Sequence, residues 1–91
     1  MARIKPVDYE TKPVDTFTIA ELTDALSVEA SAELLSTSRR AIYTVRNTNV
    51  VSYERLMKLI EAVKADEATC RRRLVILQHN RRIRADRRDP K

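Results

Sequence analysis

At 91 residues the chain has room for one small domain, and its 43% hydrophobic and 34% charged content excludes a disordered chain. Glycine is absent, which makes hairpin turns with positive φ hard to build and favours helices, and the single cysteine, Cys70, excludes an internal disulfide. No apolar run approaches the ~18 residues of a membrane span, the N-terminus lacks a signal-peptide core, and the net charge is +5. We therefore expect a cytoplasmic protein that can bind a polyanion.

Residues 1–16 contain two of the three prolines, within a Lys-Pro-Val-Asp sequence that occurs at 5–8 and again at 12–15. Proline restricts itself and the residue before it to extended geometry, which predicts an extended or disordered arm. Arg3 and Lys5 could place such an arm along DNA. Because its charges balance, an unstructured leader fits the sequence equally well.

Four short amphipathic helices are predicted between residues 17 and 64. The first begins after Thr18, which has capping-box spacing to Glu21, and Ser27, Ser38 and Ser52 can cap the helices that follow. Helical spacing gives each helix one buried face. These faces are formed by Ile19, Leu22, Thr23 and Leu26; Val28, Ala32 and Leu35; Ala41, Ile42 and Val45; and Leu56, Leu59, Ile60 and Val63.

The third predicted helix spans about residues 39–46, after the polar break Ser36-Thr37-Ser38. Asn47 and Asn49 are expected to end it, since asparagine tolerates the left-handed conformation at helix exits. The residues that its buried face leaves outside are Arg39, Arg40, Tyr43, Thr44 and Arg46.

Residues 65–84 are predicted to form a fifth helix, with Asp66 and Glu67 at its start and the basic tail 85–91 after it. Four consecutive apolar residues, 74–77, cannot be assigned by periodicity, so a short strand remains an alternative. Leu74, Ile76 and Leu77 are candidates for a dimer interface, and the alternative is that this segment only covers the monomer core. The prediction is an all-α compact bundle of four to five short helices with an extended N-terminal arm.

Charge changes sign along the chain. Segments 1–16, 17–38, 39–64 and 65–91 carry net charges of 0, −4, +4 and +5, and no basic residue occurs between 17 and 38. Ordinary solvated surface charge explains the basic residues but not their exclusion from twenty-two consecutive positions. This polarity favours a nucleic acid that docks on one side of the molecule.

Placed in order, these residues resemble the lambda-repressor-like helix-turn-helix family, the Cro and cI group of small regulators. The resemblance covers about Thr18 to Val63, roughly half of the chain, and 52–59 is similar to the family segment S-x-E-x-L-x-x-L. The family has a small residue in its second helix, where this chain has Ala32. Ser38 stands at the N-terminus of the family's recognition helix, and Ile42 and Val45 occupy two buried positions of that helix.

Three positions depart from the family pattern. Ser36 stands where the turn usually has glycine, at a cost of about 1 kcal/mol if its φ is positive. Val28 replaces a glutamine that often contacts DNA, and Thr48 stands where a glycine often ends the recognition helix. These departures shift the expected specificity onto the outer face of the third helix.

The resemblance implies a sequence-specific transcriptional repressor that binds double-stranded DNA as a homodimer, on half-sites about 34 Å apart. It also implies an origin in a phage or other mobile element, hence a bacterial cell or phage-infected host. The resemblance also indicates which residues contact DNA. The expected base-contacting residues are Arg39, Arg40, Tyr43 and Thr44. The expected phosphate-contacting residues are Ser38, Arg46, Asn47 and Ser52.

An enzyme is not expected, because one histidine, His79, and one cysteine cannot assemble a zinc site and no glycine-rich phosphate loop exists. We expect no cofactor, no metal and no small-molecule substrate. The main alternative is a protein-interaction regulator, antitoxin-like or anti-repressor, whose helical core binds another protein. The C-terminal arginines could also bind RNA, although no aromatic stacking platform accompanies them.

Overall fold

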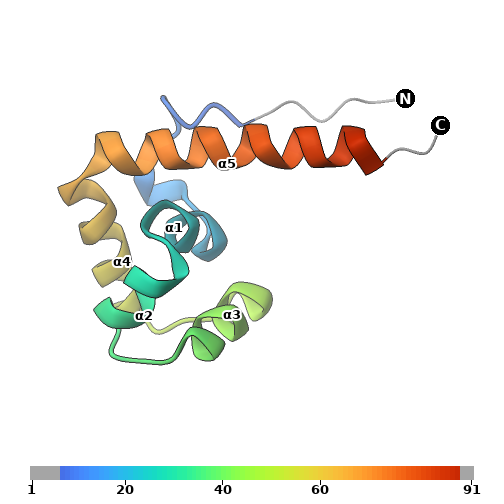
Figure 1. Cartoon of the computed structure of the whole chain (residues 1–91). Helices are drawn as coiled ribbons and strands as arrows, with labels where there is room; N and C mark the ends of the chain where they lie inside the picture. Colours follow the sequence, from blue (N-terminus) through green and yellow to red (C-terminus); the bar gives the residue numbers. More distant parts are fainter. Residues whose placement is uncertain (1–6, 89–91) are drawn as a thin grey trace.

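The computed structural model describes residues 7–88, and the side chains of residues 7–84 within them. A 3-10 helix, η1 (Val14–Thr16), precedes the five helices α1 (Ile19–Leu26), α2 (Val28–Leu34), α3 (Arg39–Thr48), α4 (Tyr53–Ala65) and α5 (Glu67–Arg88) (Figure 1). The predicted all-α bundle is confirmed. The alternative of a strand at 74–77 is wrong, because these residues lie within α5.

Side-chain caps define where the first four helices begin. Thr18 and Glu21 form the predicted capping box, in which the Glu21 N–H donates to Thr18 Oγ1 (3.1 Å) and the Thr18 N–H donates to Glu21 Oε1 (2.8 Å). The hydroxyls of Ser27, Ser38 and Ser52 accept from backbone N–H groups three residues on, as predicted. Each cap stabilises its helix by about 1 kcal/mol, so local sequence fixes these boundaries.

The core lies around α1, which packs against α2, α3, α4 and α5. Every helix contributes to it, and the predicted faces are confirmed in their main members, although Leu26, Val28, Ala41, Val45 and Leu56 are only partly buried. The most deeply buried apolar side chains are Leu22, Ile42, Leu59 and Val63.

Three helix junctions use residues with positive φ in place of glycine, and these are Ser27 (φ 87°), Ser36 (φ 53°) and Asn49 (φ 57°). After α2, the Ser36 N–H donates to the Glu33 carbonyl (3.2 Å) and the Thr37 N–H donates to the Ala32 carbonyl (2.9 Å). This pair of bonds is the Schellman motif. Ser36 therefore keeps the left-handed conformation of the turn without a glycine.

Residues 7–16 correct the expectation of an extended or disordered arm. A turn at 9–11 leads into η1, the Val14 side chain is buried, and the Tyr9 ring meets the Phe17 ring edge-on with centroids 6.0 Å apart. The Arg71 guanidinium on α5 donates to the carbonyls of Tyr9 (2.6 Å) and Lys12 (2.8 Å). These bonds hold the segment on α5; Arg3 and Lys5 lie outside the described residues.

The helix α5 runs along one side of the molecule, with α3 on the opposite side, and its C-terminal end projects past the other helices (Figure 1). Cys70 and Leu74 attach its N-terminal half to the core, and burial raises the pKa of the Cys70 thiol. The helix continues to Arg88, four residues beyond the prediction. Among the residues described here, none of the helices combines the length and the apolar character that a membrane crossing requires.

Candidate nucleic-acid interface

The outer face of α3 carries all four residues predicted to contact bases. Ile42 is buried beneath the helix, and successive residues turn by about 100° in an α-helix. The polar residues therefore fall within one arc of about 140° on the side opposite the core. That arc, which we call the α3 outer face, consists of Arg39, Arg40, Tyr43, Thr44 and Asn47, all exposed.

The two arginines at the start of α3 differ in their surroundings. Arg39 Nη1 lies 3.3 Å from Glu29 Oε1 on α2, and because both side chains are largely exposed the pair is worth under about 1 kcal/mol. Arg40 has no ion pair with any side chain among residues 7–84. A phosphate or a base edge can therefore engage Arg40 directly, and Arg39 after a weak pair is broken.

Arg46 corrects the expectation that its side chain lies outside. Its Nη1 donates to Asp24 Oδ1 (2.6 Å) and to Thr23 Oγ1 (3.0 Å), both on α1, and the side chain is only 18% exposed. Arg46 therefore fastens α3 to α1, and in this conformation it is not aimed at a phosphate.

The other predicted phosphate contacts lie at the surface. Ser38 and Ser52 are exposed helix caps whose hydroxyl oxygens accept backbone N–H groups (3.1 and 3.3 Å). Asn47 lies inside α3 on its outer face, so the expectation that it ends the helix is wrong. The expectation for Asn49 is confirmed, since Asn49 ends α3 in the left-handed conformation with its N–H donating to the Val45 carbonyl (2.8 Å).

Two exposed residues beside α3 were not among the predicted contacts. Val50 is in the α3–α4 connection and Tyr53 is the first residue of α4, and both are highly exposed. Helical spacing could not have found them, because Tyr53 lies three residues before Leu56 and seven before Ile60, which places it near the buried face, and Val50 lies outside the predicted helices. Tyr53 places an aromatic ring and a hydroxyl next to the cap at Ser52.

Comparison of the chain with family models, with curated proteins and with solved structures finds no match. The interpretation of this surface therefore depends on its own residues and geometry.

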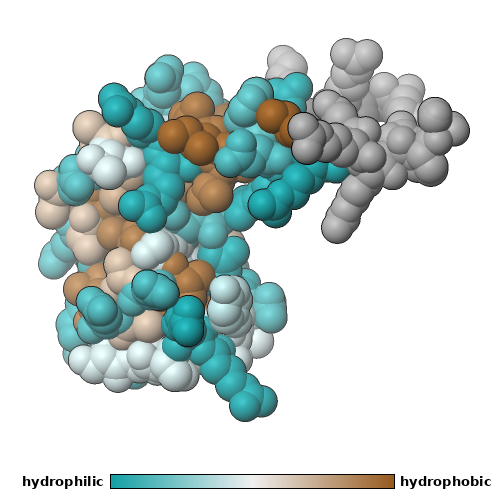
Figure 2. Space-filling model, viewed as in Figure 1, coloured by the Kyte–Doolittle hydropathy of each residue, from teal (hydrophilic) through white to brown (hydrophobic). Residues whose placement is uncertain are grey.

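The predicted dimer residues divide between core and surface. Leu74 is buried in the monomer core, which corrects its assignment as an interface residue. Ile76 is 52% exposed, and with Leu77 it lines a groove of about 280 Å³ on α5 whose other lining residues are Thr69, Arg72 and Arg73. Figure 2 shows hydrophobic residues gathered over α5 among hydrophilic ones.

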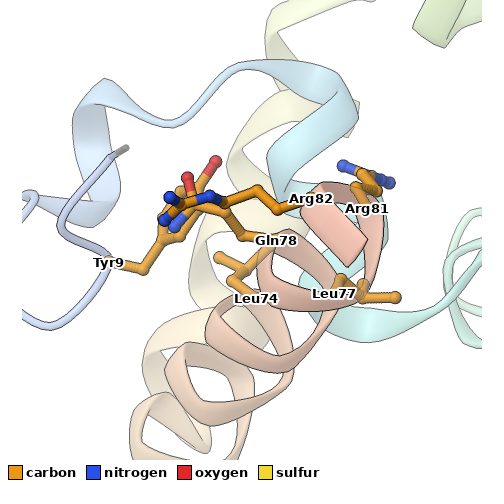
Figure 3. A pocket seen from close by; sticks show the side chains of 6 residues that line it. All are labelled: Tyr9, Leu74, Leu77, Gln78, Arg81 and Arg82. Atoms are coloured by element: carbon orange, nitrogen blue, oxygen red, sulfur yellow. The ribbon is translucent and has the colours of Figure 1, made fainter. Parts of the chain in front are cut away.

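A cavity of about 290 Å³ lies between Tyr9 of the N-terminal segment and α5, and its other lining residues are Leu74, Leu77, Gln78, Arg81 and Arg82 (Figure 3). The side chains of Gln78 and Arg82 extend toward Tyr9. Burial and the adjacent Glu21 carboxylate raise the pKa of Tyr9 to about 12, and the Tyr9 hydroxyl donates to Glu21 Oε2 (2.7 Å).

Glu21 collects several bonds beneath this segment. Burial opposes its ionisation, but hydrogen bonds from Lys12, the Thr18 N–H and Tyr9 outweigh that effect and lower the pKa of Glu21. Lys12 Nζ lies 2.7 Å from Glu21 Oε1. These groups fasten the N-terminal segment and lie outside the α3 outer face.

Proposed function

We propose that this protein is a sequence-specific transcription regulator that binds double-stranded DNA by inserting α3 into the major groove. The observation that carries the proposal is the α3 outer face, which gathers two arginines, a tyrosine, a threonine and an asparagine on one exposed arc. Ten helical residues span about 15 Å, and the major groove, about 12 Å wide, admits one helix. An arginine can grip a guanine through two hydrogen bonds, and Tyr43 can pack on a thymine methyl group.

The charges around α3 support one orientation on the duplex. The exposed side of α2 carries Glu29 and Glu33, whereas α3 begins with Arg39 and Arg40. Acidic side chains repel phosphates and arginines attract them, so the duplex is drawn to α3 and not centred on α2. Ser38 and Ser52 can then donate their hydroxyl hydrogens to phosphates, which fixes the register without reading sequence.

The resemblance to the Cro and cI group extends this proposal to a repressor that acts as a homodimer on a near-palindrome. The α5 groove around Ile76 and Leu77 supports an interface away from α3, since α5 lies on the opposite side of the molecule (Figure 1). A dimer joined through this groove would leave the α3 outer face of each copy exposed.

Selection of bound duplexes from a random library tests the proposal directly. A sequence-specific dimer should enrich a near-palindrome whose half-sites lie about 34 Å, one helical turn, apart. Fluorescence titration on the selected duplex and on a scrambled one should then show an affinity ratio of at least about 10³. Enrichment of no sequence would contradict the proposal.

The protein-interaction alternative is favoured by one observation, the exposed apolar groove on α5. In that case the groove holds a different protein and DNA contact is secondary. Binding of DNA without sequence preference, together with tight binding of a protein that is lost when Ile76 is replaced by Asp, would favour this alternative.

A further inference from the structure

The Asp24 carboxylate joins three helices through two arginines. Asp24 lies in the last turn of α1, and its Oδ1 accepts from Arg46 Nη1 on α3 (2.6 Å). Its Oδ2 accepts from Arg81 Nη2 on α5 (2.9 Å). One carboxylate thus engages two guanidinium groups that are 35 residues apart in the sequence.

The two arginines are held to different degrees. The side chains of Asp24 and Arg46 are only 13% and 18% exposed, so salt screens their pair less than it screens a surface pair. Arg46 also donates to the hydroxyl of Thr23, which is itself fully buried and donates to the Ile19 carbonyl (2.9 Å). Among the side chains of residues 7–84, Arg81 has no comparable second partner, and it is 59% exposed.

We propose that Asp24 is a positioning residue that sets the DNA specificity of this protein by withholding two cations from the phosphates. The inference rests on the DNA-binding function proposed above. A cation that reaches a phosphate raises the affinity for every sequence alike, and it adds nothing to discrimination between sequences. With Arg46 turned inward and Arg81 paired with the same carboxylate, binding depends more on the base-reading residues of the α3 outer face.

Asp24→Asn tests the proposal, because the amide keeps the shape of the side chain but loses the charge that holds the arginines. Affinity is measured on the selected and the scrambled duplex between about 50 and 200 mM salt. We expect several-fold tighter binding to the scrambled duplex at low salt and a smaller ratio between the two duplexes. The slope of log affinity against log salt should become more negative by about 0.9 for each phosphate newly contacted.

A merely structural role for Asp24 predicts a different result. If loss of the carboxylate only displaced α3, the variant would bind both duplexes more weakly and the salt slope would not steepen; either finding overturns the proposal. Glu29→Gln is the matched control, since it makes the same charge change beside Arg39, whose pair with Glu29 is exposed and weak. This control should leave the salt slope nearly unchanged.

If Asp24→Asn does not fold, Arg46→Gln provides a second test of the proposal. An arginine withheld from DNA contributes no phosphate contact, so this variant should keep the wild-type salt slope. A slope less negative by about 0.9 would show that Arg46 contacts a phosphate, and the proposal would then be wrong. Failure of the wild-type protein to bind any duplex would instead contradict the proposed function itself.

Discussion

Arg71 and Arg40 are both arginines, but one is enclosed by contacts within the protein and the other faces solvent. Arg71, on α5, is only 16% exposed and bonds Glu67 Oε2 (2.8 Å) and two backbone carbonyls of the N-terminal segment, while stacking 5.8 Å from the Phe17 ring centre. Arg40, on α3, is exposed and has no ion pair among the described side chains. The Arg71 guanidinium is therefore engaged within the protein, whereas the Arg40 guanidinium is accessible to a binding partner.

The same contrast separates the two sides of the molecule. Where the N-terminal segment, α1 and α5 meet, charged groups are partly buried and paired, as in Lys12 with Glu21 and Arg71 with Glu67. On the outer surface of α2 and α3 the polar groups face solvent, and the ion pair between these two helices, Arg39 with Glu29, is exposed. If the α3 outer face binds DNA as proposed, stability and recognition depend on different surfaces, and a mutation on one surface should spare the property that depends on the other.

The largest expected effect is on stability, from Arg71→Ala. This change leaves the carbonyls of Tyr9 and Lys12 without their donor, and an unsatisfied buried polar group costs about 1–3 kcal/mol. The stacking on Phe17 is lost as well, at about 0.5–1 kcal/mol. We expect the free energy of unfolding to fall by about 2–3 kcal/mol, measured by urea denaturation followed by circular dichroism.

Arg72→Ala is the matched control for this measurement. Arg72 is the next residue on α5, but it is exposed and has no ion pair among residues 7–84. Its removal should change stability by less than about 0.5 kcal/mol. Equal destabilisation by the two substitutions would show that the bonds of Arg71 do not fasten the N-terminal segment.

The next effect is on DNA binding, from Arg40→Ala. Loss of one base contact should weaken binding to the selected duplex by about 1–3 kcal/mol and relax the preference at one base pair, with stability changed by less than about 0.5 kcal/mol. If Arg40→Ala weakens binding to the selected and the scrambled duplex equally, Arg40 contacts a phosphate and not a base.

A smaller effect on stability is expected at alkaline pH, where Tyr9 of the N-terminal segment loses its proton. Because the pKa of Tyr9 is raised from 10.0 to about 12, the native state holds this proton more tightly than the unfolded chain does. The stabilisation is complete below pH 10 and is lost as pH rises from 10 to about 12. Tyr9→Phe should remove that part of the pH dependence, with a loss of roughly 1 kcal/mol at neutral pH, the net value of one hydrogen bond.

Thermal unfolding of the wild type and of Tyr9→Phe across that pH range makes the comparison. Tyr43→Phe is the control, since Tyr43 is exposed on α3 and its hydroxyl has no hydrogen bond among the described residues. This variant should follow the wild-type pH profile. Parallel profiles for Tyr9→Phe and the wild type would argue against the Tyr9–Glu21 bond in solution.

What the sequence predicts well here is what neighbouring residues determine. The caps at Thr18, Ser27, Ser38 and Ser52 and the buried helix faces follow from spacings of three or four residues, and so does the exposed arc of α3. The fastening of Arg46 could not be read this way, because its partner Asp24 lies 22 residues away on another helix. The ordered segment 7–16 depends on bonds to Arg71 about 60 residues later, which no local pattern indicates.

The smallest expected effect is at the junction that sets α3 in place. Ser36 keeps φ at 53°, a conformation that costs a non-glycine residue about 1–2 kcal/mol, whereas glycine adopts it freely. Glycine also loses more entropy on folding, so Ser36→Gly should stabilise the protein by a net ~0.5–1 kcal/mol. The two backbone bonds of the turn, from Ser36 to Glu33 and from Thr37 to Ala32, need no side chain and should persist.

Urea denaturation measures this gain, and Asn49→Gly provides the comparison, since asparagine already tolerates the left-handed conformation and should gain less. Affinity for the selected duplex should stay within about 0.5 kcal/mol of the wild type, because Ser36 lies outside the α3 outer face. Destabilisation by Ser36→Gly would mean that the chain does not hold a positive φ at this position. A gain in stability with unchanged affinity would show that the turn needs only its backbone bonds to set the direction of α3. The exposed side chains of α3 would then not be required to hold the turn and could contact DNA.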